Sequence, residues 1–288
     1  MISVICTTFN QPDFLEYQYK LSKKFIEDEF EFFVYDNSTN SNLENKFKNI
    51  CQGNNIRYFK VPSNGGNPSQ RAGFSLNYAL DHNYDYYNNN IAVLDSDLFP
   101  ISKINFSKHL KNVDIYGRGQ IRPLPSETGS DYAIHKNLLD EVRKNYNDIC
   151  NGINTSIYNH IYYFSNQYVI LNMKNLKDFN NNNRFLPGSV NGITGDCGAY
   201  LHDYILKNNI THQSVGIEYM PEIKKDSNIY QYARNELSIL ENGYSELIDE
   251  SLLHFRSGSN WQGHTNQIQS ERLKNLYSLL EGFLNESN

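Results

Sequence analysis

The sequence lacks the signals of an exported, membrane-spanning or disulfide-bonded protein. Its cysteines are isolated and form no Cys-x-x-Cys pair, which indicates reduced core thiols rather than zinc ligands or disulfides; they are Cys6, Cys51, Cys150 and Cys197. An apolar segment follows Met1 directly, and no later apolar run approaches the roughly 18 residues that a membrane span requires. We therefore expect no signal peptide, no transmembrane segment and a cytoplasmic location.

Positive charge is also scarce. The chain has 26 lysines and arginines against 32 aspartates and glutamates, which gives a net charge of −6 at pH 7. Nucleic-acid binders concentrate positive charge on one surface, so this balance argues against a nucleic-acid partner. The Walker pattern that ends in Gly-Lys-Ser/Thr is absent as well, which disfavours a P-loop nucleoside triphosphatase.

Aromatic residues, in contrast, are plentiful. The chain of 288 residues has 22 tyrosines and 16 phenylalanines, and 39% of its residues are hydrophobic. This is enough to form the core of one large α/β domain. We find no internal repeat and no linker that would divide the chain.

The first hundred residues alternate between strand-like and helix-like segments. Short apolar runs predict strands, and apolar residues at helical spacing predict helices. The expected strands cover residues 2–7, 31–35, 56–61 and 91–94, and the expected helices cover residues 14–25, 43–51 and 70–80. This order predicts an α/β fold with a mainly parallel central sheet and right-handed crossovers.

The pattern changes after Pro100. Further strands are expected at residues 113–118, 168–173 and 215–220, and further helices at residues 136–147, 158–163, 195–207 and 229–240. The last segment, residues 267–284, is amphipathic, and its apolar face consists of Leu273, Leu276, Leu280 and Phe283.

Two carboxylates follow the apolar run at residues 91–94. Asp95 and Asp97 are one residue apart, and side chains at i and i+2 of an extended segment project the same way. Open α/β sheets bind ligands at the carboxyl ends of their strands. Two hard oxygen ligands suit Mg²⁺ or Mn²⁺ holding a diphosphate. In the simpler interpretation, one aspartate only caps the following segment.

Four segments in this order resemble the motifs of GT-A glycosyltransferases, most closely those of the inverting family 2: residues 2–10, 34–38, 64–67 and 94–97. The resemblance implies a Rossmann-like three-layer sandwich. It also implies a single catalytic domain at residues 1–264, with a nucleotide-binding half at 1–100 and an acceptor-facing half at 101–264. Residues 265–288 would then form a C-terminal helix packed on that domain.

The resemblance further implies a set of nucleotide-sugar-binding residues: Thr8, Asn10, Asp36, Asn64, Gly65, Arg71, Asp95 and Arg256. Thr8 and Asn10 would lie beside the base, and Asp36 would accept a hydrogen bond from base or ribose. Arg71, in a glycine-bearing loop that opens a helix, and Arg256 would supply positive charge near the phosphates. The simpler interpretations are a polar turn at Asp36 and a solvated Arg71 on an ordinary surface loop.

The same resemblance implies a metal site. Asp97 would ligate the ion, Asp95 would contact the ion or the ribose, and His254 would be a further ligand. The ion would be Mn²⁺, for which imidazole is an acceptable ligand, or Mg²⁺. Alternatively, His254 is a hydrogen-bonded interior residue without a metal.

A catalytic base is implied at Asp196, which follows a glycine-containing loop before a helix. The Glu-Asp pair that is usual in the resembled family is Gly195-Asp196 here, and this departure puts the role of Asp196 in doubt. Aspartate is also a favoured helix N-cap, which requires no catalysis. Asp203 and Glu218 are weaker substitutes for the base.

These residues lead us to expect a glycosyltransferase that moves a sugar from a UDP-sugar to a hydroxyl of a glycan, glycolipid or protein, with inversion favoured over retention. A GT-A-like module that binds sugar nucleotide or glycan without turnover is an alternative from another class. A sugar nucleotidyltransferase ranks below both, because the first strand is followed by residues 7–12 rather than by a glycine-rich loop with arginine.

Overall fold

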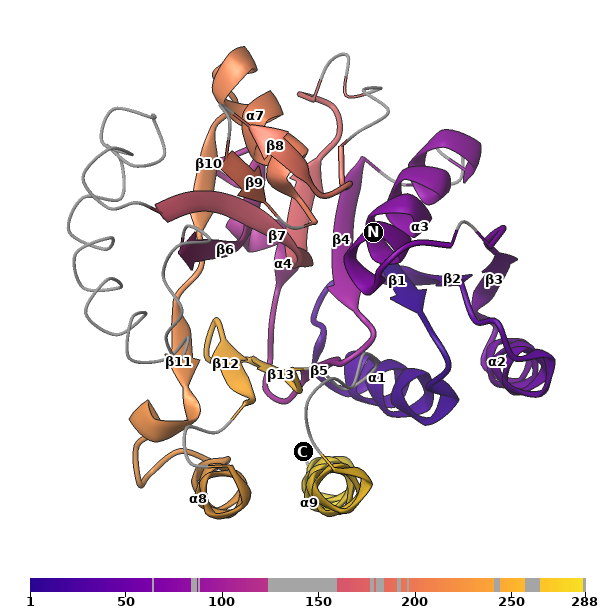
Figure 1. Cartoon of the computed structure of the whole chain (residues 1–288), viewed down its shortest axis with the longest axis vertical. Coiled ribbons are helices and arrows are strands. Elements are labelled where there is room, and N and C mark those ends of the chain that lie inside the picture. The colour runs from indigo at the N-terminus through magenta and orange to yellow at the C-terminus, as the bar shows by residue number, and fades with distance from the viewer. Residues whose placement is uncertain are drawn as a thin grey trace.

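A seven-stranded sheet forms the centre of the molecule in the computed structural model (Figure 1). In spatial order its strands are β10 (His212–Ser214), β6 (Ile115–Pro123), β7 (His160–Asn172), β4 (Asn90–Asp95), β1 (Ile2–Thr8), β2 (Phe30–Asp36) and β3 (Arg57–Lys60). Strand β7 is antiparallel to both of its neighbours, and the remaining pairs are parallel. The expected α/β class with a mainly parallel central sheet is confirmed.

The structure describes residues 1–63, 65–83, 87, 89–123, 160–176, 179, 184–190, 193–195, 197–240, 244–256 and 265–286. Helices cover both faces of the central sheet (Figure 1). Those of one face are α1 (Pro12–Phe25) and α2 (Ser41–Gly53), and those of the other are α3 (Pro68–Asn83) and α7 (Ala199–Asn208).

Alternation along the buried strands creates the two cores between these layers. In β1, Ile5 packs in the cluster with α3 and α7, whereas Val4 and Cys6 pack in the cluster with α1 and α2. In β4, Val93 and Leu94 divide in the same way. Both faces of these strands are buried, which explains why they appear in the sequence as continuous apolar runs.

A second, antiparallel sheet adjoins the first. Its order is β11 (Ile217–Tyr219), β12 (Glu246–Ile248), β13 (Leu252–His254) and β5 (Leu98–Pro100). Strand β5 begins a few residues after β4 ends, so the chain passes from one sheet to the other at this point. The junction therefore lies at the carboxyl edge of the central sheet.

Two helices pack beside this second sheet, α8 (Tyr230–Ile239) and α9 (Asn266–Asn285) (Figure 1). The amphipathic tail predicted from the sequence is α9, and Leu276, Leu280 and Phe283 are buried in its cluster. The side chain of Thr265 caps α9 by accepting a hydrogen bond from the Ile268 N–H.

The remaining described elements are short: α4 (Phe106–His109), β8 (Gly188–Val190), β9 (Ile193–Gly195) and the 3₁₀ turn η2 (Met220–Glu222). The expectation of a helix at residues 158–163 is wrong for residues 160–163, which begin β7. That run is rich in aromatic residues, which favour strands, and it is too short for periodicity to separate the two states. The expected helix at residues 136–147 lies outside the described residues.

Cys6, Cys51 and Cys197 are buried free thiols, as expected, and Cys150 lies outside the described residues. Within the described part of the chain, every helix is too short or too polar to cross a membrane.

Candidate metal and nucleotide-sugar site

Asp95 and Asp97 lie at the junction of the two sheets. Asp95 is the last residue of β4, opposite Thr7 of β1, and its Oδ1 accepts a hydrogen bond of 2.8 Å from the Ser96 N–H. Gln18, a fully buried residue of α1, forms hydrogen bonds to the backbone of this turn. Its Nε2 donates to the carbonyl oxygens of Asp95 and Leu98, at 2.6 and 2.7 Å. The backbone around both carboxylates is therefore fixed.

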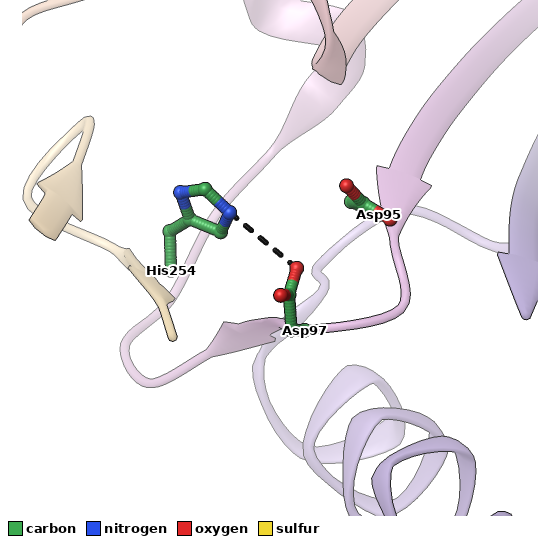
Figure 2. Close-up of side chains that lie close together, drawn as sticks. All are labelled: Asp95, Asp97 and His254. Atoms are coloured by element: carbon green, nitrogen blue, oxygen red, sulfur yellow. Dashed lines mark ion pairs between the residues drawn. The ribbon is translucent and has the colours of Figure 1, made fainter. Parts of the chain in front are cut away.

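His254 approaches the same junction from β13. It pairs with Leu98 across the antiparallel sheet, and the next N–H, that of Phe255, donates to the Asp97 carbonyl at 2.8 Å. His254 Nε2 lies 3.4 Å from Asp97 Oδ1. Figure 2 shows the side chains of Asp95, Asp97 and His254 converging from the end of β4, the turn before β5 and the end of β13. One ligand atom from each residue lies within 4.8 Å of the other two.

These three donors fit a small divalent cation. Bonds of about 2.0–2.1 Å place neighbouring octahedral ligands about 3 Å apart and opposite ones about 4.2 Å apart. The separation of 3.4 Å between His254 Nε2 and Asp97 Oδ1 is close to the first value, and all three ligand atoms lie within 4.8 Å of one another. Two carboxylate oxygens and one imidazole nitrogen suit Mn²⁺. Three protein ligands also leave positions for the oxygens of a diphosphate.

A carboxylate that our sequence reasoning missed lies on the other side of the imidazole. Glu246 of β12 is fully buried, and its Oε1 is 2.7 Å from His254 Nδ1. The same oxygen accepts a hydrogen bond of 2.5 Å from Nη2 of Arg118, a buried residue of β6. A charged residue within a short apolar strand was the only signal in the sequence, and it does not reveal the partner.

The charges of this cluster shift two pKa values. Burial alone would lower the pKa of His254, but hydrogen bonds and charge from Asp97 and Glu246 raise it to about 9. Burial would raise the pKa of Glu246, but the charge of Arg118 and the hydrogen bond from His254 hold it well below its usual range. The two carboxylates thus favour positive charge on the imidazole that lies between them.

A pocket opens beside Asp95. It is lined by residues from the ends of β1, β2 and β4 and from the start of α3: Thr7, Thr8, Phe9, Asn37, Pro68, Arg71, Ala72, Ser75, Asp95 and Ser96. Three residues expected from the sequence to bind the nucleotide sugar, Thr8, Arg71 and Asp95, therefore share one cavity. Phe9, Asn37 and Ser75 were not singled out beforehand.

Some polar groups in and next to this pocket form hydrogen bonds within the protein, and others do not. The Arg71 guanidinium lies over the Phe9 ring, 4.5 Å from its centroid, and Nη1 donates to the Gly66 carbonyl at 3.1 Å. Thr8 Oγ1 and Asn10 Oδ1 are buried and have no hydrogen-bond partner among the described residues. Buried acceptors of this kind normally find a partner, so both suit a bound ligand.

Asp36 is buried beneath this region rather than among the lining residues. Its Oδ1 accepts from the Ser38 N–H at 2.8 Å, and its Oδ2 accepts from the Tyr58 hydroxyl at 2.8 Å and from Lys60 Nζ at 3.3 Å. Ser38 in turn accepts a hydrogen bond from the Asn10 N–H, and Asn10 has a φ of 55°. Asp36 thus orders the loop that holds Asn10, and its contact with base or ribose stays a prediction.

The remaining expected residues lie in less defined positions. Gly65 has a left-handed φ of 64°, and Asn64 lies outside the described residues. The Arg256 guanidinium lies 5.3 Å from the centroid of the Tyr244 ring, and its own carbonyl accepts a hydrogen bond from the C-terminal helix α9. Its contact with a phosphate stays a prediction.

Asp196, expected as the base, also lies outside the described residues. The N-cap of α7 is Gly198, with a φ of 96°, so the expected helix at 195–207 begins at Ala199. Of the two substitutes for the base, Asp203 pairs with Lys207 on α7 at 2.7 Å, and Glu218 lies on β11.

Three solved structures similar to this chain are glycosyltransferases. They are the mannosyltransferase PcManGT from Pyrobaculum calidifontis with GDP-Man and Mn²⁺ (12% identity, TM-score 0.44, 98% of this chain and 71% of that chain), the bifunctional glycosyltransferase WbbM (9%, 0.48, 96% and 49%), and the galactosyltransferase LgtC with donor and acceptor sugar analogs (16%, 0.33, 60% and 58%). No family model and no curated protein matches the chain.

Proposed function

We propose that this protein is a metal-dependent glycosyltransferase that transfers a sugar from a UDP-sugar to an acceptor hydroxyl in glycan biosynthesis. One observation carries the proposal: Asp95, Asp97 and His254 meet at the carboxyl edge of a mainly parallel sheet, and a pocket opens at the first of them. Carboxylates and imidazole around one point suit a divalent cation, and a pocket beside it suits the nucleotide that the cation would help to hold.

Three residues would hold the metal, Asp95, Asp97 and His254. There, Mn²⁺ or Mg²⁺ would supply positive charge against the negative charge that develops on the diphosphate leaving group. Asp97 and His254 are buried (4% and 1% exposed), and burial would strengthen their electrostatic interaction with a bound cation.

Residues in the pocket, together with Asn10 and Arg256, would bind the nucleotide. Thr8 and Asn10 offer acceptor oxygens to the base or ribose, and Arg71 offers a fixed positive charge. Arg256, two residues beyond His254 in the sequence, would contact a phosphate. We infer that Asp36 contributes by ordering the loop at Asn10, because both of its oxygens already accept hydrogen bonds from the protein.

In the proposed reaction the acceptor oxygen forms a bond to the anomeric carbon while the bond from that carbon to the diphosphate breaks. The acceptor hydroxyl loses its proton to Asp196, and the diphosphate leaves with the bonding electron pair. This route inverts the anomeric centre. Asp196→Asn should therefore bind UDP as the unchanged protein does and lose transfer, whereas unaffected turnover would remove Asp196 as the base.

The metal site can be tested by titration calorimetry of UDP with and without Mn²⁺. We expect UDP to bind more strongly with Mn²⁺ than without it. Asp97→Asn should reduce this gain in affinity by on the order of tenfold to a hundredfold, because even the loss of a residue that only hydrogen-bonds to a metal ligand has an effect of this size. Asp226→Asn is the matched control, because Asp226 is exposed and is not one of the proposed metal ligands. Equal affinity with and without Mn²⁺ would contradict the metal assignment.

The departure at Gly195 favours one alternative, a module that binds a sugar nucleotide without turnover. Transfer to acceptor, or slow hydrolysis of the UDP-sugar, distinguishes the two functions. Metal-dependent binding of UDP-sugars without release of UDP over many hours would identify the binding module instead of the enzyme.

A further inference from the structure

Glu246 and His254 face each other across an antiparallel strand pair. They are register partners on β12 and β13, and both are at least 99% buried. Glu246 Oε1 lies 2.7 Å from His254 Nδ1, whereas His254 Nε2 lies 3.4 Å from Asp97 Oδ1. The imidazole is therefore held between one carboxylate on the metal side and one on the opposite side.

The carboxylate of Glu246 meets the imidazole and the arginine with the same oxygen. Its Oε1 accepts from both His254 and Arg118, whereas Oε2 has no hydrogen-bond partner among the described residues. Nε and Nη1 of Arg118 also lack a hydrogen-bond partner among the residues that the structure describes. An arginine and a carboxylate that met only to pair would favour two parallel hydrogen bonds, and this pair forms one.

A second buried pair in the same protein gives the comparison. Arg272 of α9 donates from both Nε and Nη2 to a single oxygen of Glu236 on α8, Oε1, at 2.8 and 2.6 Å, and Oε2 of Glu236 accepts from the Ser245 N–H. In that pair every carboxylate oxygen is used and no imidazole takes part. At Glu246, in contrast, one oxygen is shared between Arg118 and His254, so the imidazole is part of the buried cluster.

We propose that Glu246, held by Arg118, is a positioning residue that keeps the proton of His254 on Nδ1 and so directs the Nε2 lone pair to the metal. The inference rests on the proposed metal site. A hydrogen bond from one ring nitrogen to a carboxylate fixes the tautomer and ring orientation of a ligating histidine and raises its basicity. Because Arg118 belongs to β6 of the central sheet, this contact also ties the second sheet to the first.

The test is Mn²⁺ binding followed by electron paramagnetic resonance, with the coupling of imidazole nitrogen to Mn²⁺ as a direct sign of His254 ligation. The unchanged protein should show that coupling, and His254→Gln should not. Glu246→Leu should weaken Mn²⁺ binding about 10- to 100-fold and lose the nitrogen coupling. Glu246→Gln keeps an acceptor oxygen at the same place, so it should keep the coupling with a smaller loss of affinity.

Two controls separate positioning from stability. Glu236→Gln weakens the other buried pair and should leave affinity and coupling unchanged. If Glu246→Leu does not fold because Arg118 is left unpaired, the double variant Arg118→Met/Glu246→Leu removes both buried charges and should still lose the coupling. Wild-type affinity and coupling in a folded Glu246→Leu or double variant would overturn the positioning role alone. Absence of Mn²⁺ binding in the unchanged protein would overturn the metal site and the positioning role together.

Discussion

Burial and hydrogen bonding determine what the individual residues at this site can do. Thr8 and Asn10 have buried acceptor oxygens without hydrogen-bond partners in the described part of the chain. Both carboxylate oxygens of Asp36, in contrast, accept hydrogen bonds from other residues of the protein. These residues looked equivalent in the sequence, because each is a polar residue at a strand end. The structure separates groups that could meet a ligand from one that orders the loop around it.

The role of Asp36 leads to a prediction at this scale. Asp36→Asn keeps the size of the side chain but removes the charge that Lys60 and Tyr58 face, so we expect a loss of about 2 kcal/mol in the free energy of unfolding. UDP affinity should fall as well, since Ser38 and Asn10 depend on this anchor. Urea denaturation and calorimetry measure the two effects.

The matched control lies on the same strand. Glu31 of β2 pairs with Arg57 at 3.0 Å in an exposed position, and exposed pairs contribute little. Glu31→Gln should change stability by less than about 0.5 kcal/mol. An equal loss in both variants would mean that the buried position of Asp36 has no special role.

At the scale of elements, the site is built where β4 leaves the central sheet and β5 enters the second one. A sharp junction of this kind exposes carbonyl oxygens that neither sheet can pair. Helix α1 supplies the missing donor through Gln18, whose Nε2 donates to the carbonyls of Asp95 and Leu98. One buried amide therefore holds the turn on which both carboxylates depend.

Gln18→Leu should show this dependence. Leucine keeps much of the volume but leaves two carbonyl oxygens without their donor, and we expect a loss of about 2–3 kcal/mol in the free energy of unfolding. Mn²⁺-dependent UDP binding should weaken too, because the spacing of Asp95 and Asp97 is no longer fixed. The control is Gln52→Leu on the exposed face of α2, and losses no larger than in this control would contradict the role of Gln18.

At the scale of the whole molecule, stability depends on pH through groups buried in their neutral form. His202 of α7 is buried, and burial together with the charge of His212 lowers its pKa from 6.5 to about 3. The unfolded chain takes up a proton near its ordinary pKa, and the folded chain does not. The contribution of His202 to stability is therefore present above about pH 6.5 and decreases as pH falls toward about 3.

This direction of the pH dependence can be tested by comparing the stability of His202→Gln with that of the unchanged protein. Between pH 7 and pH 5 the unchanged protein should lose about 2 kcal/mol of unfolding free energy relative to the variant. His82→Gln, at an exposed position of α3, controls for the loss of one imidazole. A difference between His202→Gln and the unchanged protein that stays constant over this pH range would contradict a neutral, buried His202.

Much of the fold follows from the sequence, because strands and helices are read from local patterns. The alternation in the first hundred residues predicted β1 to β4 and α1 to α3 within a few residues. The helix predicted at residues 160–163 was wrong because this aromatic run is too short for its periodicity to distinguish a helix from a strand. Among the candidate site residues, Thr8, Arg71 and Asp95 share the described pocket.

By itself, the sequence determined the buried strand before Asp95 and the placement of two carboxylates at its end, since an apolar run and the residues after it are local properties. Only the tertiary structure decided which distant groups join them. His254 reaches Asp97 because β13 pairs with β5, Glu246 reaches His254 because β12 pairs with β13, and Arg118 comes from the other sheet. These contacts depend on strand pairing between segments far apart in the chain, and no spacing within one segment encodes them.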